Sequence, residues 1–251
     1  MDDGTSLDQS QLDSLWDFGD PAASAERFRA AADEADNEVV KAEYLTQLAR
    51  ALGASEEFDD AVAVLDDAAE GLPSPSALVD ARIALEQARL LVARDLPHEA
   101  VPFLLTAVRK ASAAGSAFIA LDALHMLALV DTGHEEEWAH EGIDALDSVA
   151  DPRTRRWGVA FHNNLGWRLL YAGNPDAALD HFESALHIAE TVGTENQRFV
   201  ARWAKAKCLR ALGRTDEAIA IQRELAAERP AEASVAVELA EMTGASPTIK
   251  E

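Results

Sequence analysis

The sequence has 251 residues, of which 48% are hydrophobic, and it carries a formal net charge of −23. This charge argues against non-specific binding to nucleic acid, because such affinity comes from Lys and Arg side chains that neutralise phosphates. No apolar stretch is long enough to span a bilayer, and the acidic start MDDGTSLDQS lacks the basic and then apolar pattern of a signal peptide. We therefore expect a cytoplasmic protein without a membrane partner.

Five alanines recur along the chain at intervals of 39, 39, 39 and 40 residues: Ala61, Ala100, Ala139, Ala178 and Ala218. A fixed period of this size indicates a repeated supersecondary unit that buries its apolar face only when its neighbours stack on it. A further copy lies near the start, where Ser24, Phe28 and Ala31 align with Ala178, Phe182 and Ala185.

The prediction is one all-α domain over residues 1–251, an α-solenoid of about six helix-turn-helix repeats with short disordered termini. The approximate repeats are 8–37, 38–72, 77–112, 116–150, 157–192 and 196–230, and a capping helix follows at 231–244. Cys208 is the only cysteine, so an internal disulfide is excluded, and we expect a buried, unreactive thiol.

The fifth repeat shows the pattern most clearly, as FHNNLGWRLLYAGNPDAALDHFESALHIAE from Phe161. Its Leu165-Gly166 pair, and an Ala-x-x-x-Phe pattern from Ala178 to Phe182, resemble the signature of tetratricopeptide repeat proteins of the bacterial type. Small residues at Gly166 and Ala178 would let two antiparallel helices approach closely. The resemblance implies a right-handed superhelix with a concave groove. HEAT-like repeats share the long 39–40-residue period and stay as the alternative fold.

Charge is distributed unevenly along this acidic chain. Between Arg153 and Arg214 ten basic residues stand against five acidic ones, so this segment is +5, whereas the remainder is −28. Much of the positive charge lies at 198–214, in the first helix of a repeat, and first helices face inward in the tetratricopeptide family.

The family geometry, carried over to this chain, places aromatic, amide and cationic side chains in the groove of the late repeats. The candidate partner-binding residues are Asn163, Asn164, Trp167, Tyr171, Trp203, Lys207 and Arg210. Earlier repeats would contribute Gln47, Arg50, Leu85, Glu86, Arg89, Leu124, His125 and Asp131. Such a late groove suits an acidic or carboxylate-bearing segment, because Arg and Asn donate to oxygens and aromatic rings supply flat contact area. The alternative is structural: the rings pack between helices, and the cations pair with acids of neighbouring repeats.

A carboxylate clamp of the kind that holds chaperone C-termini is not expected. Asn164 matches its central Asn, but Ala128 and Ala204 stand among the positions where the clamp needs cations. Catalytic, cofactor and metal motifs are also missing from the sequence, since no HExxH, CxxC, phosphate loop or nucleophile elbow occurs. We therefore expect no enzyme, no cofactor and no metal.

Two functions follow from these patterns. The first is a protein-protein interaction scaffold that binds a peptide or partner segment in the groove. The alternative is a regulatory or sensor module that changes conformation when a small ligand or signalling peptide enters it. A homodimer is kept open, and the identity of the partner lies outside what the sequence specifies.

Overall fold

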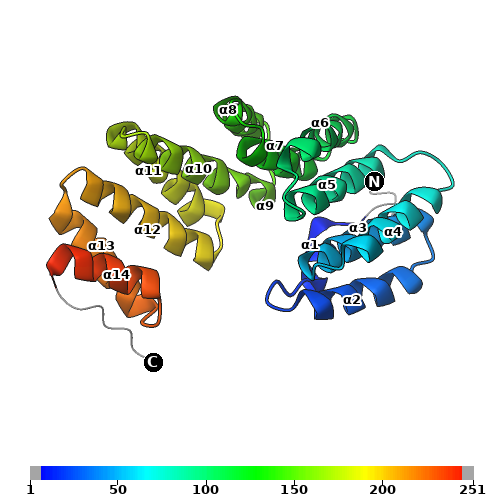
Figure 1. Cartoon of the computed structure of the whole chain (residues 1–251), viewed down its shortest axis with the longest axis horizontal. Helices are drawn as coiled ribbons and strands as arrows, with labels where there is room; N and C mark the ends of the chain where they lie inside the picture. The colour runs from blue at the N-terminus through cyan, green and yellow to red at the C-terminus, as the bar shows by residue number, and fades with distance from the viewer. Residues whose placement is uncertain (1–6, 245–251) are drawn as a thin grey trace. The chain divides into compact units, whose positions relative to one another are not determined.

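The computed structural model describes residues 7–244, and within this range it contains helices and no strand (Figure 1). The all-α prediction is confirmed. The predicted disordered termini fall largely on residues 1–6 and 245–251, which lie outside the described residues. The helices are α1 (Gln9–Leu15), α2 (Pro21–Asp33), α3 (Glu38–Ala54), α4 (Phe58–Glu70), α5 (Ala77–Ala93), α6 (Pro97–Ala113), α7 (Ala117–Val130), α8 (Glu135–Leu146), α9 (Pro152–Arg155), α10 (Trp157–Tyr171), α11 (Pro175–Val192), α12 (Glu195–Ala211), α13 (Thr215–Glu228) and α14 (Ala233–Thr243).

Helix starts follow local sequence chemistry. The side chain of Asn37 accepts hydrogen bonds from the first amides of α3, and Thr194 and Gln197 form a reciprocal capping box at the start of α12. Proline occupies the first turn of α2, α6 and α11, where its missing N–H costs nothing. These signals explain why the helices begin at these residues.

In the second to sixth repeats, the turn between the paired helices adopts the left-handed conformation at one residue. Gly173 and Gly213 have φ values of 79° and 75° in the late repeats, where glycine carries no steric penalty. Glu56 and Asp95 take the same conformation in the earlier repeats, with φ values of 63° and 62°. The early turns thus keep the geometry of the late ones without the glycine that makes it visible in the sequence.

The structure divides into two compact units, residues 1–138 and 139–251, with the boundary inside α8. We call them the N-terminal unit and the C-terminal unit. Within the N-terminal unit, α3 contacts α5 and α5 contacts α7, so the first helices of successive repeats lie next to one another. In the C-terminal unit α10 contacts α12 in the same way. The expectation of one continuous domain stays a prediction.

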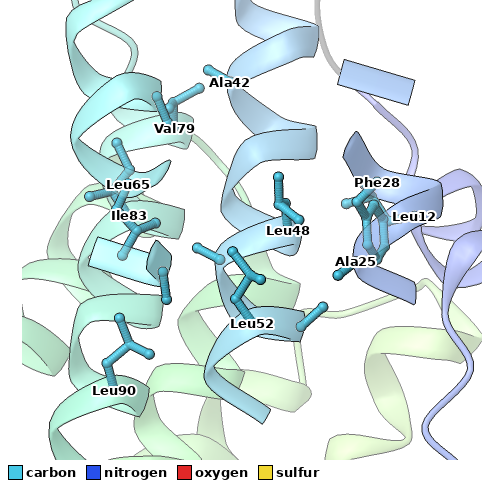
Figure 2. Close-up of a cluster of buried hydrophobic side chains, with 14 residues drawn as sticks. Leu12, Ala25, Phe28, Ala42, Leu48, Leu52, Leu65, Val79, Ile83 and Leu90 are labelled. Carbon is cyan, nitrogen blue, oxygen red and sulfur yellow. The ribbon is translucent and has the colours of Figure 1, made fainter. Parts of the chain in front are cut away.

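The core of the N-terminal unit is built around α3. Figure 2 shows Leu48 and Leu52 of this helix between Phe28 on one side and Ile83 and Leu90 on the other. All five side chains are buried. Because α3 presents apolar residues to both neighbours, each repeat depends on the next for its burial, as expected for a solenoid.

The C-terminal unit has close helix crossings at the residues expected from the sequence. A Cβ atom at Gly166 would lie 2.6 Å from the Cε1 atom of Phe182, so α10 approaches α11 only because residue 166 has no side chain. The five periodic alanines of the whole chain, Ala61, Ala100, Ala139, Ala178 and Ala218, are all at most 2% exposed. The alanine period thus marks buried positions in every one of these repeats. At the end of the unit, Val235 and Leu239 of α14 pack on Phe199 and Leu225, which makes α14 the expected cap.

Candidate partner-binding surfaces on the first helices

An aromatic group lies on α10 and α12 of the C-terminal unit. Trp167 packs edge-on against the buried Phe182, and its ring centroid lies 5.7 Å from that of Tyr171 and 5.6 Å from that of Trp203. Tyr171 is 83% exposed, whereas both tryptophans are half-buried. We call Trp167, Tyr171 and Trp203 the aromatic surface. The structure thus brings the three predicted rings together and leaves one of them open to solvent.

The two predicted cations beside this surface are already ion-paired. The Lys207 Nζ atom lies 2.6 Å from a Glu238 carboxylate oxygen and 5.2 Å from the centre of the Trp203 ring. Arg210 places its Nε atom 3.2 Å from Glu238 and its Nη1 atom 2.5 Å from Glu241. Glu238 is only 4% exposed, so α14 supplies a sheltered anion to both cations.

Other cations of the basic segment also have partners. Lys205 pairs with Glu183 at 2.9 Å, and Arg202 pairs with Glu228. Arg156 and Arg198 donate to the backbone oxygens of Val192 and Gly193, at 2.7 and 2.8 Å. Of these four cations, Lys205 pairs with an acid of the neighbouring repeat, as the structural alternative expects, Arg202 pairs within its own repeat, and Arg156 and Arg198 are held by backbone oxygens.

The predicted amides lie one turn before the aromatic surface on α10, and both are half-buried. Among residues 7–244, neither the buried Oδ1 atom of Asn163 nor the buried Nε1 atom of Trp203 has a hydrogen-bond partner. Asn164 takes part in an interaction within the chain. Two buried polar atoms without partners are unusual in a folded protein, and both lie next to the aromatic surface.

A charged network crosses the first helices of the N-terminal unit. Arg89 of α5 contacts Glu86 of the same helix at 3.2 Å and Asp122 of α7 at 2.5 Å. Glu43 of α3 and Arg82 of α5 form a looser pair at 3.9 Å. All three acidic residues are at most 4% exposed. Burial raises the pKa of Glu86 and of Glu43, and the nearby arginines oppose this effect.

Arg50 of α3 lies beside this network without an ion pair in the described part of the chain. Its guanidinium carbon is 5.2 Å from the centre of the Trp16 ring and 6.0 Å from that of Phe18. These two rings stack at 4.9 Å, Phe18 is 73% exposed, and Trp16 donates a hydrogen bond to Gln47. A cavity of about 310 Å³ adjoins Arg50, and α3, α5 and α7 form its wall.

The sequence identified only part of this second region. Gln47, Arg50, Glu86, Arg89 and His125 were expected in the groove, and all of them lie on the first helices of the N-terminal unit. Glu43, Asp122, Trp16 and Phe18 were not identified. One signal in the sequence pointed to this region. Gln47 and Arg50 of α3 recur after 39 residues as Glu86 and Arg89 of α5, so polar and charged side chains occupy equivalent positions on successive first helices.

A histidine pair joins α10 and α11. The Nδ1 atoms of His162 and His181 lie 3.0 Å apart, and His140 of α8 is close enough to act on both electrostatically. Burial, followed by the two neighbouring histidines, lowers the pKa of His162 to about 4. Within residues 7–244, no group of three or more His, Cys, Asp or Glu side chains is arranged to hold a metal ion. The pair is therefore a neutral hydrogen-bonded contact between two helices.

Cys208 behaves as a structural residue. It is fully buried, its Sγ atom donates to the backbone oxygen of Pro175 at 3.1 Å, and burial raises the pKa of its thiol. A raised pKa keeps the thiol protonated and unreactive near neutral pH, as the sequence predicted. In the described range no helix combines the length and hydrophobicity needed to cross a bilayer.

Two models of the tetratricopeptide repeat family match this chain, one over residues 13–115 and the other over residues 169–240. The chain is a tetratricopeptide repeat protein. A comparison with curated proteins finds no match. Tetratricopeptide repeat proteins are generally non-catalytic scaffolds, and their domains typically bind protein partners.

Two solved structures show the same fold. BtubC (BKLC) from P. vanneervenii matches with a TM-score of 0.63 and 18% identity, and the match covers 96% of this chain and 95% of that protein. The apo form of the quorum sensor NprR from B. thuringiensis matches with a TM-score of 0.63 and 13% identity, over 92% of this chain and 66% of that one. Both likenesses concern the fold, and the tetratricopeptide repeats themselves support a protein-interaction or regulatory module.

Proposed function

We propose that this tetratricopeptide repeat protein binds an extended segment of a protein partner on the inner surface of α10 and α12. Trp167, Tyr171 and Trp203 provide the main contact area. The side-chain amides of Asn163 and Asn164 contribute hydrogen bonds to the segment, and Lys207 and Arg210 attract an acidic or carboxylate-bearing group on it.

The exposure of Tyr171 is the observation that carries this proposal. A ring that is 83% exposed is available to a partner, and it stacks on a tryptophan that itself packs against Phe182. Rigid aromatic side chains dominate the energetics of protein interfaces because they bury a large area for little loss of rotamer entropy. The aromatic surface therefore has the features of an interface hot spot.

The ion pairs of Lys207 and Arg210 limit the electrostatic part of the contact. An incoming carboxylate shares these cations with Glu238 and Glu241 instead of meeting free charges. Both cations keep some accessibility, with side chains 27% and 34% exposed. We therefore expect the rings to contribute more affinity than the charges do.

A displayed library of random peptides tests this proposal while the natural partner is unidentified. Peptides selected on the parent protein should bind Tyr171→Ala at least tenfold more weakly, and should be enriched in acidic residues. The matched control is Phe103→Ala, which removes a partly exposed ring from α6 of the other unit. Selected peptides that bind Tyr171→Ala as tightly as the parent would refute the aromatic surface as the partner site.

The alternative function is a regulatory module that responds to a small ligand, and one observation favours it. The cavity beside Arg50 lies on the first helices of the N-terminal unit, separate from the aromatic surface. A ligand that alters the module should change the small-angle scattering profile of the protein, whereas a rigid scaffold should keep the same profile with the ligand bound.

A further inference from the structure

We propose that the cavity between α3, α5 and α7 binds a small monoanion that carries a carboxylate on a compact apolar body. This site lies in the N-terminal unit and does not depend on the partner surface of α10 and α12.

The size and lining of the cavity suit a small amphiphilic ligand. Its volume of about 310 Å³ is at the lower end of the range of about 300–1,000 Å³ that is typical of small-molecule sites. Leu90, Val92 and Met126 line it with apolar side chains, and Arg50, Glu86 and Arg89 form its charged part. A ligand that fills it therefore needs a polar group at one end and an apolar group at the other.

Arg50 is the cation that lacks an anion. The three buried carboxylates of the network are held by Arg82 and Arg89, at 3.9, 3.2 and 2.5 Å. Arg50 has an aromatic neighbour in Trp16 but no carboxylate within ion-pairing distance among the described residues. A sheltered cation without a contacting anion is costly, and a ligand carboxylate would remove that cost.

The protonation equilibria agree with this geometry. Burial and then the positive charge of Arg89 lower the pKa of Arg50, which shows that the site destabilises its positive charge. Burial raises the pKa of Glu86, so the negative charge that faces Arg50 is weakened as well. Glu86, Asp122 and Asp13 partly offset the effect on Arg50, but none of them contacts its guanidinium among the described residues, so the place of a contacting anion is open to a ligand carboxylate.

The same network selects against a doubly charged ligand. Glu86 and Asp122 lie within the charged network that adjoins the cavity, so a phosphate dianion would meet two carboxylates where a carboxylate brings a single charge. The net charge of −23 adds a general repulsion of polyanions. A monoanion with apolar surface is thus the ligand class that fits both parts of the wall.

Hexanoate is a suitable probe, used with the full-length protein in a ligand-detected NMR titration. Hexanoate should bind, and hexanamide and hexyl phosphate should bind at least tenfold more weakly. Arg50→Gln should weaken hexanoate binding at least tenfold. The matched control is Arg94→Gln, because Arg94 lies 5.2 Å from the ring of Phe58, as Arg50 does from Trp16, but not in this cavity.

A second variant keeps the test decisive if Arg50→Gln disturbs folding. Ala93 is exposed at the edge of the cavity, so Ala93→Leu should narrow the entrance, weaken hexanoate binding and leave the melting temperature unchanged. Tyr171→Ala should bind hexanoate as the parent does, which separates this site from the proposed partner surface.

A short peptide that ends in leucine identifies the source of the carboxylate, when it is compared with its C-terminal amide. If the peptide with a free carboxylate binds more tightly than hexanoate, and its C-terminal amide binds more weakly, the site is assigned to a polypeptide C-terminus. Tighter binding of hexanoate assigns it to a free small acid. The proposal is wrong if neither hexanoate nor the peptide binds, or if Arg50→Gln and Ala93→Leu both bind them as tightly as the parent.

Discussion

The first helices of the two units carry cations at equivalent repeat positions but neutralise them in different ways. In the N-terminal unit the acids that hold Arg89 come from first helices, Glu86 of α5 and Asp122 of α7. In the C-terminal unit the acids that hold Lys207 and Arg210 come from the capping helix α14. The comparison teaches that a basic stretch of sequence is not a basic surface, because the neutralising acids lie outside the stretch.

The largest difference between the two regions should appear when a buried acid is removed. Asp122→Asn leaves Arg89, whose side chain is 24% exposed, with Glu86 as its one remaining carboxylate at contact distance among the described residues. Loss of one member of a buried ion pair costs about 3–5 kcal/mol. We expect a loss of about 3 kcal/mol, at the lower end of that range, in urea unfolding followed by circular dichroism.

Glu238→Gln is the counterpart in the C-terminal unit, and its effect should be smaller. Lys207 and Arg210, at 27% and 34% exposed, are slightly more open to water than Arg89, and Arg210 keeps a second, exposed acid in Glu241 at 2.5 Å. Water and Glu241 can therefore replace part of the lost contact. A loss of about 1–2 kcal/mol is expected, from the cost of an impaired charged hydrogen bond. Equal losses for Asp122→Asn and Glu238→Gln would contradict the distinction between a buried network and a capping contact.

The apolar packing, in contrast to the charges, should respond alike in both units. Ala61→Phe and Ala178→Phe each place a large ring at a fully buried helix crossing, which costs about 1–3 kcal/mol through overpacking. The control is Ala227→Phe, at an exposed position on α13. Thermal unfolding should show both destabilisations, and an unchanged melting temperature for either variant would disprove the shared repeat register.

Acid should act on the C-terminal unit through the pair of His162 and His181. The fold lowers the pKa of His162 from 6.5 to about 4, so it favours the neutral ring. This contribution to stability is present above pH 6.5 and is lost progressively as the pH falls towards 4. Chemical unfolding at a series of pH values should show a weaker pH dependence in this window for His162→Gln than for the parent. Identical pH profiles would show that the histidine pair has no role.

The smallest expected effect is on ligand binding at Arg210. Glu241 is 51% exposed and competes with a partner carboxylate for the same guanidinium. Glu241→Gln should therefore raise the affinity of an acidic peptide by about two- to threefold, a size typical of exposed ion pairs. Fluorescence anisotropy with a labelled peptide would measure it, and a neutral analogue of that peptide should show no gain.

Much of the fold could be predicted because it is encoded locally. The alanine period and the Leu165-Gly166 pair report on helix crossings inside single repeats, and these are found where they were expected. The glycine of the late turns is replaced by Glu56 and Asp95 in the early ones, which explains why the first repeats were harder to recognise.

The candidate sites were less predictable because their partners are remote in the sequence. The 39-residue period relates Arg82 to position 121 and not to Asp122. The repeat pattern therefore did not point to Asp122. Glu238 belongs to the capping helix, outside the basic segment 153–214. The contact of His162 with His181 joins two helices, so no spacing within a single helix could indicate it.

Photo-cross-linking tests the proposed partner surface most directly. In one variant the photoreactive residue benzoyl-phenylalanine replaces Tyr171 of the C-terminal unit, and in the other it replaces Phe103 of the N-terminal unit. Each variant is irradiated in the presence of the same library-selected acidic peptide. We predict a cross-linked product from position 171 that mass spectrometry maps to the peptide, and none from position 103. Cross-linking from position 103 and not from position 171 would contradict the assignment of the partner surface to α10 and α12.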